Sequence, residues 1–164
     1  PIVAIENKKD YSKEFLDVKE EYEIIVGDGL FPTIVLRPWY DASDSVIIAT
    51  YGGALDIAMD VASEIFTFYE KNPVIVVFSL VSPLIIKDMI EIISEPSHVI
   101  TIEEGNEKYG FGSELISLLS NQGFNFKSMK MASDPFPIPS SIHLERENLV
   151  AFEKYFSKME HFFQ

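Results

Sequence analysis

Three short runs of apolar, β-branched residues constrain the fold of this chain more than any other feature. They are Val46–Tyr51 (VIIATY), Val74–Leu80 (VIVVFSL) and His98–Ile102 (HVITI). Each run is apolar almost throughout, which is the pattern of a strand buried on both faces of a sheet. Segments with helical spacing follow the runs, at Ala54–Tyr69, Ile86–Ile93 and Ser113–Leu119. Because strands that alternate with helices imply parallel crossovers, the sequence predicts a three-layer α/β domain.

Two further elements complete the predicted domain, which covers about residues 41–164. Phe124–Met131 (FNFKSMKM) alternates imperfectly between apolar and polar residues, so it is the candidate edge strand, and a candidate antiparallel one. A helix is predicted over Leu144–Phe163. One face of this helix is apolar, through Leu149, Phe152, Phe156, Met159 and Phe163. Such a face is usually buried in the core, but its aromatic residues also favour contact with another chain.

The segment before this domain differs in character from the rest. Residues 9–40 contain an acidic stretch at Asp17–Glu23, a glycine-rich turn and two prolines. They predict a connector with one candidate strand, at Thr33–Leu36. Residues 1–8 include PIVAIE, which is typical of a buried strand entered part-way. We therefore expect this chain to be a piece of a longer one.

Charge and composition exclude several classes of function. The chain has 26 acidic and 13 basic residues, and the resulting net charge of −13 disfavours nucleic-acid binding. It has no cysteine, so disulfides, thiolate metal sites and cysteine nucleophiles are excluded. No apolar run approaches the roughly 18 residues that a membrane-spanning helix needs. We expect a soluble, cytoplasmic protein with neither a membrane nor a nucleic acid as its partner.

The strongest local signal for a site is Glu103-Glu104-Gly105, followed by Gly110-Phe111-Gly112-Ser113. Two carboxylates held close together split their pKa values and can serve as acid and base. Adjacent residues of a strand point to opposite sides, however, so we expect one carboxylate to face a crevice and the other to face solvent or a neighbouring subunit. The glycines allow a sharp turn, and Ser113 can cap the helix that follows. The pattern favours a structural loop over a catalytic pair.

No other motif in the sequence completes an active site. Gly27-Asp28-Gly29 resembles the start of a magnesium-binding loop in which the aspartate is a metal ligand. Such a loop also needs a pair of asparagines roughly 25 residues later, which this sequence lacks, so the triplet predicts a turn. Tyr51-Gly52-Gly53 predicts a tight strand-to-helix turn, whose crevice is a candidate site for an anionic ligand. The three histidines, His98, His143 and His161, have no partners at the spacing of metal ligands, which favours structural roles. We predict no catalytic, cofactor-binding or metal-binding residue in this chain.

Several motifs along the chain match a known family. They are Pro1–Tyr11 with its Glu6, Lys8 and Tyr11, then Ile48–Gly52, Ser82-Pro83-Leu84, Thr101–Gly105 with Gly110–Glu114, and Asp134 with Pro137-Ile138-Pro139 and Leu144-Glu145. By these motifs the chain resembles the C-terminal domain of transketolase-like enzymes, most closely that of the beta subunit of thiamine-diphosphate-dependent 2-oxoacid dehydrogenases. Two positions depart from the family pattern, because Ile85 replaces an aspartate and the basic residue expected near Ser79 is missing. These departures disfavour the usual electrostatic contact at that surface.

The resemblance implies a fold and a division into segments. The fold would be a five-stranded sheet with four parallel strands and one antiparallel strand, and the extra strand would come from about residues 33–37. Residues 1–8 would be the last strand of a preceding pyrimidine-binding domain. Residues 9–40 would be a connector, and residues 41–164 the transketolase C-terminal-like domain.

The resemblance also implies a function. The parent enzyme would decarboxylate a 2-oxoacid, such as pyruvate or a branched-chain 2-oxoacid, and transfer the acyl group to a lipoyl arm. It would hold thiamine diphosphate and magnesium between two other domains, so this domain alone would bind neither and would be inactive. The domain would instead build contacts with the alpha subunit, a second beta subunit and the dihydrolipoyl acyltransferase core.

The residues predicted at this interface are Glu103, Glu104, Gly110, Gly112, Phe152, Phe156 and Phe163. Two alternatives stay open beside the dehydrogenase. In the first, the parent enzyme is a transketolase or a deoxyxylulose phosphate synthase. In the second, the chain is a non-catalytic binding module for an anionic ligand such as a nucleotide or coenzyme A.

Overall fold

The computed structural model describes residues 2–4, 20–93, 95–133, 137, 141 and 152–164. Its strands are β1 (Tyr22–Val26), β2 (Ile34–Pro38), β3 (Ala42–Thr50), β4 (Asn72–Val77), β5 (His98–Asn106) and β6 (Lys127–Ser133). Its helices are the 3-10 helix η3 (Gly52–Ala54) and the α-helices α1 (Leu55–Tyr69), α2 (Lys87–Ile92), α3 (Phe111–Asn121) and α5 (Phe152–Phe163). The predicted alternation of strands and helices is confirmed from β3 onward.

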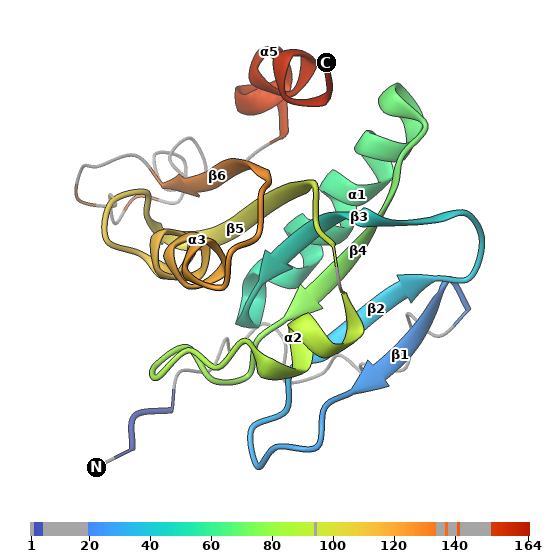
Figure 1. The fold of residues 1–164 in the computed structure, drawn as a ribbon. Coiled ribbons are helices and arrows are strands. Elements are labelled where there is room, and N and C mark those ends of the chain that lie inside the picture. The colour runs from blue at the N-terminus through green and yellow to red at the C-terminus, as the bar shows by residue number, and fades with distance from the viewer. Residues whose placement is uncertain (1, 5–19, 94, 134–136, 138–140, 142–151) are drawn as a thin grey trace.

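The six strands form one mixed sheet in the order β1-β2-β4-β3-β5-β6 (Figure 1). Strands β4, β3, β5 and β6 run parallel to one another. Strand β2 runs antiparallel to both β4 and β1. The mostly parallel α/β fold is therefore confirmed, with six strands in place of about five.

Two hydrophobic clusters fill the space on the two sides of the sheet. Ile48 and Ile100 belong to the cluster that includes residues of α1 and α5. Ile47 and Val99, one position earlier on the same strands, belong to the cluster that includes residues of α2 and α3. All four side chains are fully buried. Neighbouring residues thus enter opposite layers, which explains why these strands are apolar throughout.

The orientation predicted for the last strand is wrong. Strand β6 does lie at an edge of the sheet, but it runs parallel to β5, with Val99 opposite Ser128 and Ile102 opposite Met131. Helix α3 crosses the sheet between the two strands and returns the chain to the end at which β5 began, so β6 must run the same way. The antiparallel strand is β2, which lies at Ile34–Pro38, close to the predicted residues 33–37.

A hairpin joins the sheet within the segment that was predicted as a connector. Strand β1 pairs with β2 along its whole length, from Tyr22 opposite Pro38 to Val26 opposite Ile34. The amide of Gly27 donates to the carbonyl of Thr33 at 2.9 Å and closes the turn. The sheet therefore extends across the predicted boundary at residue 41. In the predicted strand at residues 1–8, residues 2–4 are exposed and in no strand, and residues 1 and 5–8 lie outside the described part.

The terminal helix α5 covers the outer edge of β6 (Figure 1). The hydroxyl of Tyr155 donates to the carbonyl of Ala132 at 2.9 Å and accepts from its amide at 3.1 Å. These two bonds satisfy a backbone position of the edge strand that no neighbouring strand can reach. Of the predicted helix Leu144–Phe163, the part from Phe152 is confirmed, and residues 144–151 lie outside the described residues.

Candidate functional site

The loop between β5 and α3 is held by a buried carboxylate. The side chain of Glu103 is 1% exposed. One of its oxygens accepts the amide of Phe111 and the other accepts the amide of Gly112, each at 2.9 Å. These amides belong to the first turn of α3, where backbone N–H groups have no partner inside the helix and the helix dipole favours negative charge. Glu103 therefore caps α3 from the neighbouring strand.

Two glycines make this close approach possible. A Cβ added at Gly112 would collide with Thr101 Oγ1 and would lie 3.2 Å from Glu103 Oε1. A Cβ added at Gly110 would collide with Glu103 Oε2 and would lie 2.6 Å from the carbonyl oxygen of Asn106. Because backbone and buried atoms line both positions, a larger residue cannot be accommodated without moving the loop.

Tyr51, at the end of β3, completes this cluster. Its ring packs edge-on against the ring of Phe111, with the centroids 5.2 Å apart. Burial raises the pKa of the Tyr51 hydroxyl above its ordinary value, and the charges of Glu103 and then Glu104 raise it further. The hydroxyl therefore keeps its proton at neutral pH, so it can donate a hydrogen bond but is a poor base.

Glu104 points away from Glu103, as the alternation of a strand predicts. Its side chain is exposed, and its carbonyl accepts the Ser133 hydroxyl at 2.6 Å. The loop is fastened to β6 a second time by Lys130, whose Nζ donates to the carbonyl of Glu107 at 2.9 Å and to Ser113 Oγ at 3.1 Å. The predicted capping role of Ser113 is thus filled by Glu103, which leaves the serine hydroxyl to bind Lys130.

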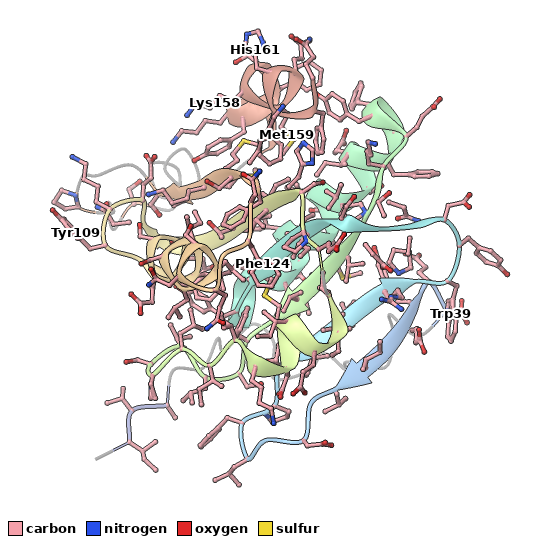
Figure 2. All side chains as sticks on the ribbon, viewed as in Figure 1. Trp39, Tyr109, Phe124, Lys158, Met159 and His161 are labelled. Carbon is pink, nitrogen blue, oxygen red and sulfur yellow. The ribbon has the colours of Figure 1, made fainter. Side chains whose placement is uncertain are left out.

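Three loops expose apolar side chains at the same end of the sheet. The turn between β1 and β2, the segment after β4 and the loop after β5 all lie at the carboxyl end of the parallel strands, because Ile34 pairs with Val77. We call the exposed side chains on these loops the carboxyl-end residues: Leu30, Phe31, Val81, Ile85 and Tyr109. Figure 2 shows Tyr109 extending outward from its loop, and this side chain is 99% exposed. Ile85 is 54% exposed.

The aromatic face of α5 is used mostly inside the chain. Tyr155, Met159 and Phe162 are buried in the cluster that α5 shares with α1. In Figure 2, Met159 points from α5 toward the sheet, whereas His161 points away from it. Phe156 packs edge-on against Phe68 of α1, with the ring centroids 5.2 Å apart.

His98, at the start of β5, lies under the end of this helix. Its ring contacts the rings of Phe162 and Phe163, at centroid distances of 5.0 and 5.4 Å. Phe163 also lies against Tyr69, at 4.8 Å. These contacts agree with the structural role that the sequence predicts for His98. The residues next to His98 along the chain give no sign that its partners are Phe162 and Phe163.

The two remaining glycine motifs serve as turns. A Cβ at Gly27 would collide with the carboxylate of Asp88 in the first turn of α2, so the glycine lets the helix approach the hairpin. Gly52 has a φ of 53°, in the region that favours glycine, and begins η3 between β3 and α1. The first turn of α1 carries an acidic residue, Asp56, which disfavours an anionic ligand there.

Metal-ligand clusters and membrane-spanning helices are both absent from the described residues. Across residues 20–93, 95–133 and 152–164, no three His, Cys, Asp or Glu side chains gather in a way that could hold a metal ion. In the same part of the chain, no helix is long and apolar enough to cross a membrane.

Comparison with known sequences decides the family. The family model described as "Transketolase, C-terminal domain" matches residues 40–150, which is more than half of the chain. The chain belongs to this family. A search of curated proteins gave no match.

The solved structures agree with this assignment at the level of the fold. A chain described as "Split gene transketolase, inactive beta4 tetramer" aligns with this transketolase C-terminal domain with a TM-score of 0.60 and 16% sequence identity. The alignment covers 73% of the present chain and 39% of the other. The chain therefore spans well under half the length of this structural relative.

Within the transketolase C-terminal domain, the predicted interface residues fall into two groups. Glu103 and Glu104 at the end of β5, Gly110 in the loop that follows and Gly112 in the first turn of α3 form one group, and Phe156 and Phe163 lie on α5. The backbone of Phe152 opens α5, and its side chain lies outside the described part. Their role in contacts between subunits stays a prediction. Inside the chain, Glu103 and the two glycines position α3, while the two phenylalanines pack against α1 and its end.

Proposed function

We propose that this chain is the assembly domain of a thiamine-diphosphate-dependent enzyme, and that the enzyme is a 2-oxoacid dehydrogenase whose beta subunit ends in this domain. Membership of the transketolase C-terminal family supports the general part of the proposal. The opening Glu6, Lys8 and Tyr11 and the later Pro137-Ile138-Pro139 motif support the dehydrogenase branch, because they resemble that branch most. In this reading the other domains hold the cofactor and its magnesium ion.

The burial and the hydrogen bonding of Glu103 are the observation that carries the proposal. Its carboxylate is the most buried acidic group among the described residues, and both oxygens already accept backbone amides. A general acid or base must reach a substrate proton within hydrogen-bond distance. Glu103 therefore serves the fold, which supports the proposal that this domain contributes contacts to the parent enzyme.

The carboxyl-end residues are the surface that we assign to this contact. They come from three loops that the sheet brings to one end, and they expose apolar side chains in a chain that is otherwise rich in charge. Exposed apolar groups that gather at one end of a domain are typical of surfaces that meet another domain or subunit. We propose that the cofactor-binding domains of the parent enzyme cover them.

Reconstitution with the rest of the enzyme tests this proposal. The DNA beside the coding region would be sequenced to identify the polypeptide that carries the diphosphate-binding and pyrimidine-binding domains, and that polypeptide would be co-expressed with this chain. The proposal predicts a stable complex that decarboxylates a 2-oxoacid in the presence of thiamine diphosphate and magnesium. Failure of the two polypeptides to copurify would contradict the assembly role.

A transketolase is the second candidate for the parent enzyme. The solved relative is described as a split-gene transketolase, although the likeness to it extends only to the fold. The same reconstituted complex distinguishes the two parents. Turnover of a ketose phosphate without turnover of any 2-oxoacid would replace the dehydrogenase by a transketolase and would leave the assembly role intact.

A further inference from the structure

The contact between His98 and the terminal helix contains an ionisable ring in mainly aromatic surroundings. The imidazole lies against Phe162 and Phe163 of α5, and Phe163 continues the contact to Tyr69 at the end of α1. The Nε2 atom of His98 is buried and has no hydrogen-bond partner among the described residues. The last turn of α5 therefore rests on a group that can change its charge near neutral pH.

The polar contacts on the other side of the ring place Nδ1 beside a hydroxyl. The oxygen of Ser97 lies 2.8 Å from His98 Nδ1 and 3.1 Å from the carbonyl oxygen of Ser45. This hydroxyl can accept from Nδ1–H or donate to a bare Nδ1, so both tautomers of the neutral ring fit the contact. In either case, protonation adds a charge to a ring whose other nitrogen, Nε2, is buried.

The charges that face His98 oppose its protonation. Lys127 faces it from β6, and Lys71 faces it from the turn between α1 and β4. The Phe162 carbonyl on α5 acts in the opposite direction, and it also accepts Lys127 Nζ at 3.3 Å, which holds that ammonium group close to the imidazole. The carboxylate that α5 carries nearby, Glu160, acts on Tyr69, where burial and then this charge raise the pKa of the hydroxyl. The remaining ionisable group of the last turn, His161, is exposed and points away from the sheet (Figure 2).

We propose that His98 is a pH-sensitive latch for α5, which holds the helix on the sheet while the imidazole is neutral and releases it when the imidazole is protonated. The latch acts on this chain whichever reaction the parent enzyme performs. Its release would uncover the Ala132 backbone groups on β6, which Tyr155 now satisfies, together with the buried Met159 and Phe162. An uncovered edge strand can pair with another chain, so acid would make the β6 edge available for such pairing.

The direction of the pH effect follows from the same contacts. Burial, and then Lys127 and Lys71, lower the pKa of His98 below its ordinary value while α5 is docked. The undocked state, in which the ring is solvated, therefore binds the proton more readily. Docking is strongest above the ordinary histidine pKa and weakens as the pH falls through that value toward the lowered one.

Hydrogen exchange of the whole chain, followed by mass spectrometry, tests the latch. Exchange rates of the α5 and β6 peptides would be corrected for the intrinsic effect of pH and compared at about pH 7.5, 6.5 and 5.5. We expect the corrected rates of both peptides to rise about threefold or more over this range, while the peptides of β3 and β4 keep theirs. In His98→Phe, which keeps a ring against Phe162 and Phe163, the rise should disappear. In His161→Gln, which removes an exposed imidazole from the same helix, the rise should persist.

Two outcomes would overturn the latch. One is a corrected rate for α5 that does not change with pH in the wild-type chain. The other is a rise that survives in His98→Phe. Lys71→Gln provides a variant that does not touch the packing, because Lys71 is exposed and acts on His98 through its charge. It should move the midpoint of the rise to higher pH, and an unchanged midpoint would also contradict the proposal.

Discussion

The β5–α3 loop and the terminal helix α5 are held to the same sheet by different forces. The loop is fastened by directional hydrogen bonds, chiefly the two that backbone amides in the first turn of α3 donate to the Glu103 carboxylate. Helix α5 is fastened mainly by apolar and aromatic contacts, to which Tyr155 and Lys127 add hydrogen bonds. In the closely packed loop, a larger side chain would break the hydrogen bonds that hold it. In the aromatic contact under α5, the unfavourable change is the burial of a charge. The loop should therefore respond most to substitution, and the helix most to pH.

The largest effect is expected from Gly112→Val. The new side chain would collide with Thr101 and crowd Glu103, so we expect a loss of about 3 kcal/mol or more in the free energy of unfolding. Denaturant unfolding measures the loss. Gly29→Ala is the matched control, because the nearest atom to its added Cβ would be 3.8 Å away. Equal stabilities of the two variants would show that the loop is not closely packed.

Glu103→Gln should have the next largest effect. The amide can accept only one of the two backbone N–H groups, and it removes the negative charge from the end of α3. We expect a loss of about 2 kcal/mol by denaturant unfolding. Glu104→Gln changes the neighbouring, exposed carboxylate and should stay within about 0.5 kcal/mol of the wild type. If the two variants were equally stable, Glu103 would have no capping role.

Tyr155→Phe should have a smaller effect on the same scale. It removes the hydroxyl that serves both backbone groups of Ala132, and we expect a loss of about 1 kcal/mol with faster hydrogen exchange in β6. Tyr109→Phe, which removes a fully exposed hydroxyl, should change neither quantity. Unchanged exchange in β6 after Tyr155→Phe would mean that the helix does not protect this edge.

The smallest effect, and the one that distinguishes the two regions, is that of mild acid on wild-type stability. Because the folded pKa of His98 is lowered, the free energy of unfolding should decrease as the pH falls from about 7 toward 5. Thermal unfolding of the wild type and of His98→Phe over this range measures the difference. If the stability of the wild type changed with pH no more than that of His98→Phe, the helix would not be more sensitive to pH than the loop.

The central part of the fold could be predicted because its local and global signals agree. Strands such as β4 are apolar on both faces, and a short run of this kind between turn residues is typical of a strand inside a parallel sheet. Strand β1 could not be predicted, because Glu21 and Glu23 flank Tyr22 and make the segment resemble an acidic linker. Its identity as a strand depends on pairing with β2, which is a tertiary contact.

The candidate site was predictable in outline but not in detail. The sequence indicated that Glu103 and Glu104 face opposite ways, because that follows from the backbone of a strand. It could not indicate that Glu103 binds amides eight and nine residues later, or that Tyr155 reaches Ala132. Both contacts depend on how separate elements meet, which no local pattern specifies. The same holds for His98, whose aromatic partners are more than sixty residues away in the chain.

The most direct test of the assembly role is the mass of the reconstituted complex when one of the carboxyl-end residues is changed. Light scattering after size exclusion would compare Ile85→Lys with Phe66→Lys. The two side chains are 54% and 53% exposed, but Phe66 lies toward the end of α1, away from the three loops. We expect Ile85→Lys to lower the mass to that of dissociated subunits and Phe66→Lys to leave it unchanged. An intact complex with Ile85→Lys, or equal losses in both variants, would contradict the proposal that this end of the sheet meets the rest of the enzyme.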